Sequence, residues 1–173
     1  VRLHWAGAAT VTPEIAFLSD RTIVFAVQVR YTDGTTTPIP RSGRAVSFAW
    51  SPDGDRMAFS RGREVYIVDL GGNRLSQFTG PPSVALGLAW SSEGREIAFY
   101  RKRYVERAYL YDLLVANVAT GMVAPLLSSD SRGAWPAWSP GGSRLAFARR
   151  PGPEDYLDWA IFVVDRDGQN ERR

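Results

Sequence analysis

The sequence predicts an all-β fold made of repeated four-stranded antiparallel units. Three observations support this prediction. A short motif that ends in a tight turn recurs along the chain, each copy leads into the same succession of short apolar strands, and 16 glycines and 11 prolines punctuate the 173 residues in small clusters. Clusters of glycine and proline at this density favour many tight turns between short strands over a few long helices.

The recurring motif is seven residues long and is centred on a tryptophan. It reads Phe-Ala-Trp-Ser-Pro-Asp-Gly at residues 48–54, Leu-Ala-Trp-Ser-Ser-Glu-Gly at 88–94 and Pro-Ala-Trp-Ser-Pro-Gly-Gly at 136–142. In such turns proline restricts φ, an acidic side chain accepts a hydrogen bond from the backbone that follows, and glycine tolerates positive φ. We therefore expect each copy to join a first strand to a second strand, and we expect the tryptophans to be structural.

Further strands follow each motif at matching positions. The second strand is expected at 57–59, 97–99 and 145–147, and the third at 65–69, 113–117 and 161–165. A fourth strand is expected at 74–78 and 123–127. Four antiparallel strands per unit make one blade of a β-propeller.

A weaker copy precedes the three clear ones. Residues 15–20 take the place of the first strand and its turn, 22–26 that of the second strand, and 31–34 that of the third strand and its turn. The anchors Phe17, Trp50, Trp90 and Trp138 are then 33, 40 and 48 residues apart, around the period of roughly 40 residues expected of a blade. We predict a single propeller domain or propeller fragment over 1–173, with blade units at about 13–44, 45–84, 85–132 and 133–173, and with 1–5 as a strand that closes the last blade.

The linked motifs resemble the WD-like repeats of the TolB family, whose units read close to Ala-Trp-Ser-Pro-Asp-Gly, then Ile-Ala-Phe, then Ile-Tyr-Val-Asp-x-Asp-Gly. The resemblance covers residues 13 to 173. It implies a propeller that usually has six blades, a periplasmic or otherwise extracytoplasmic location, and a scaffold that binds a protein or peptide. An open set of blades would expose two sheet faces and is expected to self-associate; a complete four-bladed ring is the alternative.

A candidate binding face follows from the strand order. The connections from second to third strands, and from one unit to the next, lie on the same face of a propeller. The Trp50 unit needs 19 residues from its tryptophan to the end of its third strand, whereas the Trp90 and Trp138 units need 27, so we expect eight extra residues on that face in these two units. Insertions confined to one face of a repeat array often mark its binding surface.

Arginine and aromatic side chains, which are enriched in interface hot spots, collect in these connections. The predicted binding face consists of Arg61, Arg63, Tyr100, Arg101, Arg103, Tyr104, Arg107, Arg149, Arg150, Tyr156 and Trp159. Solvated loop charges, offset by acids such as Glu64 and Glu154, are one alternative interpretation, and a glycan or polyanion site is another. The local acids and a net charge of only +3 disfavour nucleic acid, which needs a sustained positive stripe.

Signatures of catalysis and of membrane insertion are missing from the sequence. It has no cysteine, one histidine (His4), no Gly-x-Ser-x-Gly, His-Glu-x-x-His or Walker motif, and no apolar stretch long enough to span a bilayer.

Metal sites are represented only by weak candidates. Asp53, Asp69, Asp165 and Asp167 could line one, but each lies in a turn whose own backbone is the expected partner. We therefore expect a non-catalytic scaffold without a cofactor. The alternatives are calcium in the central channel, a metal-dependent enzyme with its site in that channel, and the propeller that gates a prolyl-oligopeptidase-like peptidase.

Overall fold

The computed structural model describes residues 12–19, 26–79, 85–106, 108–129, 132–150 and 159–173, and every regular element in these ranges is a β-strand. The strands form four antiparallel sheets in which neighbours in sequence are neighbours in space. The sheets are the blades of a β-propeller, and the predicted all-β fold with four blade units is confirmed. The described residues include no helix of the length and apolarity that crossing a membrane requires.

The strands of the four blades are as follows. The first blade holds β1 (Pro13–Ser19), β2 (Ala26–Tyr31) and β3 (Thr36–Pro38), and the second holds β4 (Ser47–Trp50), β5 (Arg56–Arg61), β6 (Glu64–Asp69) and β7 (Arg74–Thr79). The third holds β8 (Ala85–Trp90), β9 (Glu96–Val105), β10 (Ala108–Asn117) and β11 (Val123–Ser129), and the fourth holds β12 (Gly133–Trp138), β13 (Arg144–Arg149) and β14 (Ala160–Asp165).

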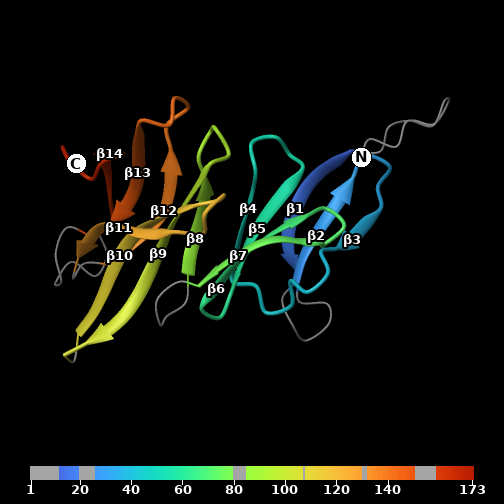
Figure 1. Cartoon of the computed structure of the whole chain (residues 1–173), viewed down its shortest axis with the longest axis horizontal. Helices are drawn as coiled ribbons and strands as arrows, with labels where there is room; N and C mark the ends of the chain where they lie inside the picture. The colour runs from blue at the N-terminus through green and yellow to red at the C-terminus, as the bar shows by residue number, and fades with distance from the viewer. Residues whose placement is uncertain (1–11, 20–25, 80–84, 107, 130–131, 151–158) are drawn as a thin grey trace.

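The blades stand side by side in the order of the sequence. Figure 1 shows the first blade, in blue, and the fourth, in orange and red, at opposite ends of the long axis of the molecule. The first strand β8 contacts both β4 and β12, and these three strands form the inner edges of their blades. The strand expected at 1–5 lies outside the described residues.

Three apolar clusters fill the spaces between neighbouring blades. Between the second and third blades, for example, Ile67 and Phe78 pack against Phe99. Each of the other two pairs of neighbouring blades shares a similar cluster. Because a blade is covered on both faces, its second strand is apolar at consecutive positions: Met57 and Phe59 face the first blade, while Ala58 faces the third. This explains why the Met-Ala-Phe, Ile-Ala-Phe and Leu-Ala-Phe segments do not alternate with polar residues.

The motif tryptophans join neighbouring inner strands. Trp90 is 8% exposed, and its indole Nε1–H donates a hydrogen bond to the Ala49 carbonyl at 3.1 Å. Trp138 donates in the same way to the Ala89 carbonyl at 3.2 Å. The repeat position of these tryptophans is therefore explained by packing between blades, as expected.

The weak first unit is organised differently from the sequence-based prediction. β1, which was expected to be the first strand, pairs with β2 as second strands pair with third strands elsewhere: Ala16 is opposite Val29 as Ala58 is opposite Ile67. β2 therefore takes the place of the third strand; it ends at Tyr31 and the predicted turn follows it, while the second strand expected at 22–26 lies, except for Ala26, outside the described residues. Gly34 has φ of 82°, and the Asp33 carboxylate accepts a hydrogen bond from the Thr35 amide at 2.8 Å. The Asp-Gly pair is thus the turn between β2 and β3, as is usual for this dipeptide between strands.

Candidate functional site

A long β-hairpin dominates the face on which second strands connect to third strands. Strands β9 and β10 are paired over their full length from Ala108–Val105 to Asn117–Glu96, with Glu106 at the tip. The eight extra residues of the third unit therefore extend two strands, and the expected inserted loop is wrong for this blade. The reason is local: residues 100–104 and 109–111 are mostly aromatic or long side chains that suit a pleated strand. The corresponding segment of the fourth blade, 151–158, lies outside the described residues.

One side of this hairpin carries a buried ion cluster. The Asp112 side chain is fully buried, and its Oδ2 accepts hydrogen bonds from Arg101 Nε at 2.8 Å and from Arg103 Nε at 2.7 Å. The Ser128 hydroxyl donates to Asp112 Oδ1 at 2.6 Å from the neighbouring strand β11. Burial alone would raise the pKa of Asp112, but the hydrogen bonds from Arg103, Ser128 and Arg101 outweigh it and hold this pKa below its ordinary value.

Asp112 therefore fixes two guanidinium groups in place. The Arg101 and Arg103 side chains are 15% and 34% exposed. Each uses its Nε and one terminal nitrogen on Asp112. The cluster of two arginines and one aspartate keeps a net positive charge next to solvent.

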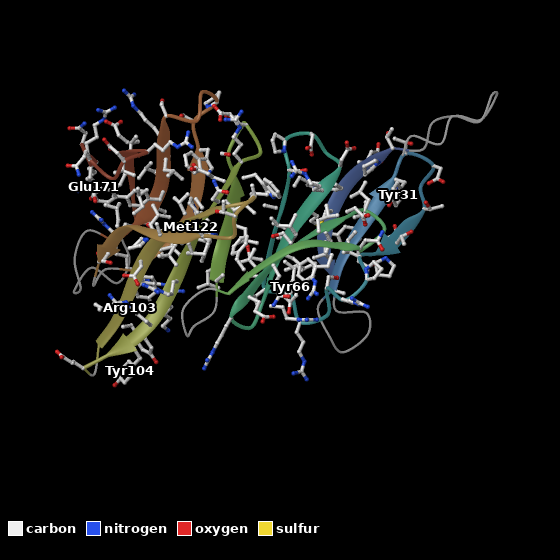
Figure 2. The ribbon with its side chains drawn as sticks, in the orientation of Figure 1. Tyr31, Tyr66, Arg103, Tyr104, Met122 and Glu171 are labelled. Carbon is white, nitrogen blue, oxygen red and sulfur yellow. The ribbon has the colours of Figure 1, made fainter. Side chains whose placement is uncertain are left out.

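The other side of the hairpin carries an aromatic and cationic group. The ammonium of Lys102 lies 3.7 Å from the ring centroid of Tyr109, and the Tyr104 and Tyr109 rings are 5.0 Å apart. Tyr104 and Tyr109 are both more than half exposed. Figure 2 shows Arg103 and Tyr104 near the end of the hairpin, toward the lower edge of the view.

The second blade presents a short basic turn on the same face. An open hollow there is lined by Arg44, Arg61, Arg63, Glu64 and Tyr66, together with two glycines. Arg61 donates to the Arg41 carbonyl at 2.8 Å and to the Tyr66 hydroxyl at 2.9 Å, so its side chain is fixed by protein groups. Arg63 is exposed in the turn.

The fourth blade contributes arginines at the corresponding end of its sheet. Arg149 forms a salt bridge with Glu171, and its guanidinium lies 4.2 Å from the ring centroid of Phe162. The Arg150 amide donates to the Arg132 carbonyl at 3.2 Å, which places these two residues together where β12 begins and β13 ends.

We call these cationic residues the basic face. It consists of Arg44, Arg61, Arg63, Arg101, Lys102, Arg103, Arg132, Arg149 and Arg150.

The opposite face of the propeller, formed by the Ser-x-x-Gly turns, balances its charges locally. There Arg56 pairs with Asp53 at 2.8 Å, and Arg144 pairs with Asp165 at 3.2 Å. A hydrogen bond from Ser51 lowers the pKa of Asp53, and one from Asn73 lowers that of Asp69. The aspartates named as metal candidates thus bind groups of their own turns. The described residues contain no group of three or more His, Cys, Asp or Glu side chains that could hold a metal ion.

The structure places the predicted binding residues in different environments. Arg61, Arg63, Arg101, Arg103, Tyr104, Arg149, Arg150 and Trp159 are placed at the end of the blades where the basic face lies, while Arg107 and Tyr156 lie outside the described residues. The prediction that Tyr100 belongs to the binding face is wrong. Tyr100 is 3% exposed and packs against Phe147, so its side chain belongs to the core between blades. Burial also raises the pKa of the Tyr100 phenol.

Sequence reasoning missed three residues at this end of the blades. Arg44, Arg132 and Trp135 lie just before or within the first strands, where one blade leads into the next. Connections between blades were expected on the binding face, and their arginines Arg44 and Arg132 carry the same signal as the arginines that were predicted. Trp135 lies inside β12, where no such signal marks it.

Comparisons with known proteins show the fold. No family model matches the chain, and no curated protein matches it. Among solved structures, a TolB protein from Agrobacterium tumefaciens has a TM-score of 0.74 and 20% identity, over 91% of this chain and 59% of that one. The expected TolB-type propeller is therefore confirmed as a fold.

Two oligogalacturonate lyase structures are also similar. One, in complex with manganese, has a TM-score of 0.72 and 19% identity, and one from Vibrio parahaemolyticus has a TM-score of 0.71 and 14% identity. Each match covers 92% of this chain and 48% of the lyase, so this chain spans about half the length of those proteins.

These matches contradict the prediction of a non-catalytic, protein-binding scaffold. The lyases are enzymes built on the same blades, and they contain the stretch of propeller that this chain resembles. The absence of Gly-x-Ser-x-Gly, His-Glu-x-x-His and Walker motifs from the sequence excluded only the hydrolases and nucleotide-binding enzymes that use these motifs. They did not exclude an enzyme whose site is made from side chains scattered over several blades.

Proposed function

We propose that this chain forms the substrate-binding part of a propeller enzyme that acts on an acidic carbohydrate polymer. The observation that carries the proposal is the basic face, where the fold holds arginines from three consecutive blades at one end of their strands. The enzymes among the similar structures act on oligogalacturonate, by their names, and this substrate is a chain of sugar rings that each carry a carboxylate.

The chemistry of the face suits such a ligand. Guanidinium groups bind carboxylates through two parallel hydrogen bonds, and a rigidly held guanidinium loses less entropy on binding. Arg101 and Arg103 are held by Asp112, and in the described part of the chain their Nη1 groups make no hydrogen bond to protein. They can therefore bind a ligand without giving up Asp112.

A metal ion is not assigned to the described residues. One of the similar lyases is in complex with manganese, an ion that suits oxygen ligands such as carboxylates. The described residues group no three His, Cys, Asp or Glu side chains that could hold a metal ion, so they do not fit a metal site of their own. The proposal therefore assigns them substrate binding and no step that runs through a metal. The proposal includes an extracytoplasmic location, because acidic carbohydrate polymers occur outside the cytoplasm.

Calorimetric titration of the 173-residue chain with hexagalacturonate, and with a neutral galactose hexamer, tests the proposal. We expect binding of the acidic hexamer only, weakening as salt is raised, because exposed charge pairs are screened. Arg63→Gln should weaken binding several-fold. Arg95→Gln is the matched control, since Arg95 lies on the opposite face with a side chain that is 78% exposed. Equal binding of the two hexamers, or an equal effect of the two substitutions, would contradict the proposal.

A further inference from the structure

Trp135 combines an unfavourable backbone with an exposed side chain. Its φ is 51°, a conformation that residues with a large side chain rarely adopt, and its side chain is 68% exposed. The residue at the same place in the third blade is Gly87, with φ of 63°, and both lie in a register irregularity of a first strand. The bend is thus a feature of the blade, and glycine is the residue that fits it without strain. Packing in the core does not explain a tryptophan there.

A second indole lies beside it. The Trp135 and Trp159 ring centroids are 5.3 Å apart with an angle of 44° between the rings. The guanidinium groups of Arg132 and Arg150 lie 5.9 Å and 5.4 Å from the Trp159 centroid. Cations therefore lie over Trp159, while Trp135 presents its ring to solvent.

The position of this group is set by the contact between two inner strands. A Cβ atom placed on Gly87 would lie only 3.2 Å from the Trp135 backbone nitrogen and 3.1 Å from Pro136 Cδ. Strands β8 and β12 therefore approach closely at Trp135, and their packing leaves little freedom to its backbone. Trp135 belongs to β12, the inner strand of the fourth blade, and Trp159 directly precedes β14, so the two indoles lie at the end of the blade where Arg132 and Arg150 of the basic face meet.

We propose that Trp135 and Trp159 form a stacking subsite for one ring of an acidic carbohydrate, with Arg132 and Arg150 binding the carboxylate of that ring. The inference rests on the proposed function and deepens it. A pyranose ring has a face of C–H groups that packs on an indole, while its hydroxyl and carboxylate groups point outward from the ring edge. Two indoles set at 44° cannot sandwich a flat aromatic ligand between parallel faces, but they can contact a puckered sugar ring. Arginine at the ring edge supplies the bidentate partner that a carboxylate requires.

Titration of the whole chain with hexagalacturonate, followed by the indole N–H resonances and by calorimetry, tests the subsite. We expect the Trp135 resonance, identified by its loss in Trp135→Ala, to shift on titration. Trp135→Ala should weaken binding about tenfold, and Trp135→Phe should restore most of the affinity. Phe17→Ala, which removes an exposed aromatic side chain from the first blade, is the matched control and should leave binding unchanged. If Trp135→Ala fails to fold, Trp135→Gly serves instead, because glycine suits the bend.

The outcomes separate the subsite from the proposed function. Binding of the acidic hexamer that is unchanged in both Trp135→Ala and Trp135→Gly would overturn the subsite and leave the proposed function standing. Equally tight binding of the neutral galactose hexamer, lost in Trp135→Ala, would overturn the acidic substrate but keep the stacking role. No binding of either hexamer by the unaltered chain would overturn both.

Discussion

Replacing Trp135 by glycine and by alanine should reverse the usual order of stability of these two residues. Alanine is normally the better residue in a strand, because glycine loses more backbone freedom on folding, about 0.5–1 kcal/mol. At Trp135 the φ of 51° changes the comparison, since a Cβ atom in this left-handed region costs about 1–2 kcal/mol. Alanine keeps that Cβ and glycine removes it.

The magnitude follows from these two opposing quantities. Their difference, about 0–1.5 kcal/mol with a midpoint of about 0.75 kcal/mol, predicts that Trp135→Gly is more stable than Trp135→Ala by about 2 °C in the midpoint of thermal unfolding for a chain of this length. Both variants lose the contact between the Trp135 and Trp159 rings, a contact of about 0.5–1.5 kcal/mol, so this loss cancels in the comparison. Trp135→Gly should therefore lie close to the unaltered chain, and Trp135→Ala should lie below it.

Urea unfolding at pH 7, followed by circular dichroism, measures both differences. Ala134→Gly in the same strand is the control, because Ala134 is not among the residues with positive φ, and glycine there should destabilise the chain by about 0.5–1 kcal/mol. Opposite signs at the two adjacent positions are the expected result. If Trp135→Ala proves at least as stable as Trp135→Gly, the backbone at this position is not strained, and a binding role is not needed to explain a tryptophan there.

Three further predictions concern the core and the ion cluster. Asp112→Asn should lower the free energy of unfolding by about 2–3 kcal/mol, because it leaves Arg101 and Arg103 without their shared counter-charge while both keep some contact with water. Folding lowers the pKa of Asp112, so the ionised carboxylate stabilises the fold above about pH 4, and this stabilisation is lost as the pH falls through the folded-state pKa. Asp112→Asn should therefore flatten the pH dependence of the free energy of unfolding between about pH 5 and 2. An unchanged pH profile would contradict this prediction. Gly133→Ala should destabilise by several kcal/mol, because its Cβ would lie 2.2 Å from a ring carbon of the buried Tyr100, whereas Gly141→Ala, with open space around it, should have little effect on thermal unfolding. Trp90→Phe removes the hydrogen bond to the Ala49 carbonyl and should cost about 1 kcal/mol or more in urea unfolding, and an effect near zero would mean that this bond does not help to join the blades.

The sequence by itself determined the blades. The motif of tryptophan, serine and turn glycine recurs with its strands in order, and each part has a local physical reason: Gly54, Gly94 and Gly142 all have positive φ in the turns, as their position predicts. The apolar second strands were recognisable for the same reason, because a blade buried on both faces needs apolar side chains at consecutive positions. The first unit was misread where the local signals were weak: residues 15–20 were assigned to a first strand and its turn, although β1 pairs with β2 as a second strand pairs with a third.

Only the tertiary structure decided which side chains meet. Tyr100 and Tyr104 are four residues apart in β9 and therefore lie on the same face of the hairpin. Tyr100 nevertheless lies in the core and Tyr104 in solvent, because the fourth blade packs on that face at Tyr100, where Phe147 contacts it, while Tyr104 lies farther out toward the tip of the hairpin. The two arginines on Asp112 depend on the register of β9 against β10, which pairs Arg101 with Asp112. Trp135 was missed because nothing in its neighbourhood in the sequence indicates a left-handed backbone. That conformation follows from the close approach of β8 and β12, two strands that are more than 40 residues apart in the sequence.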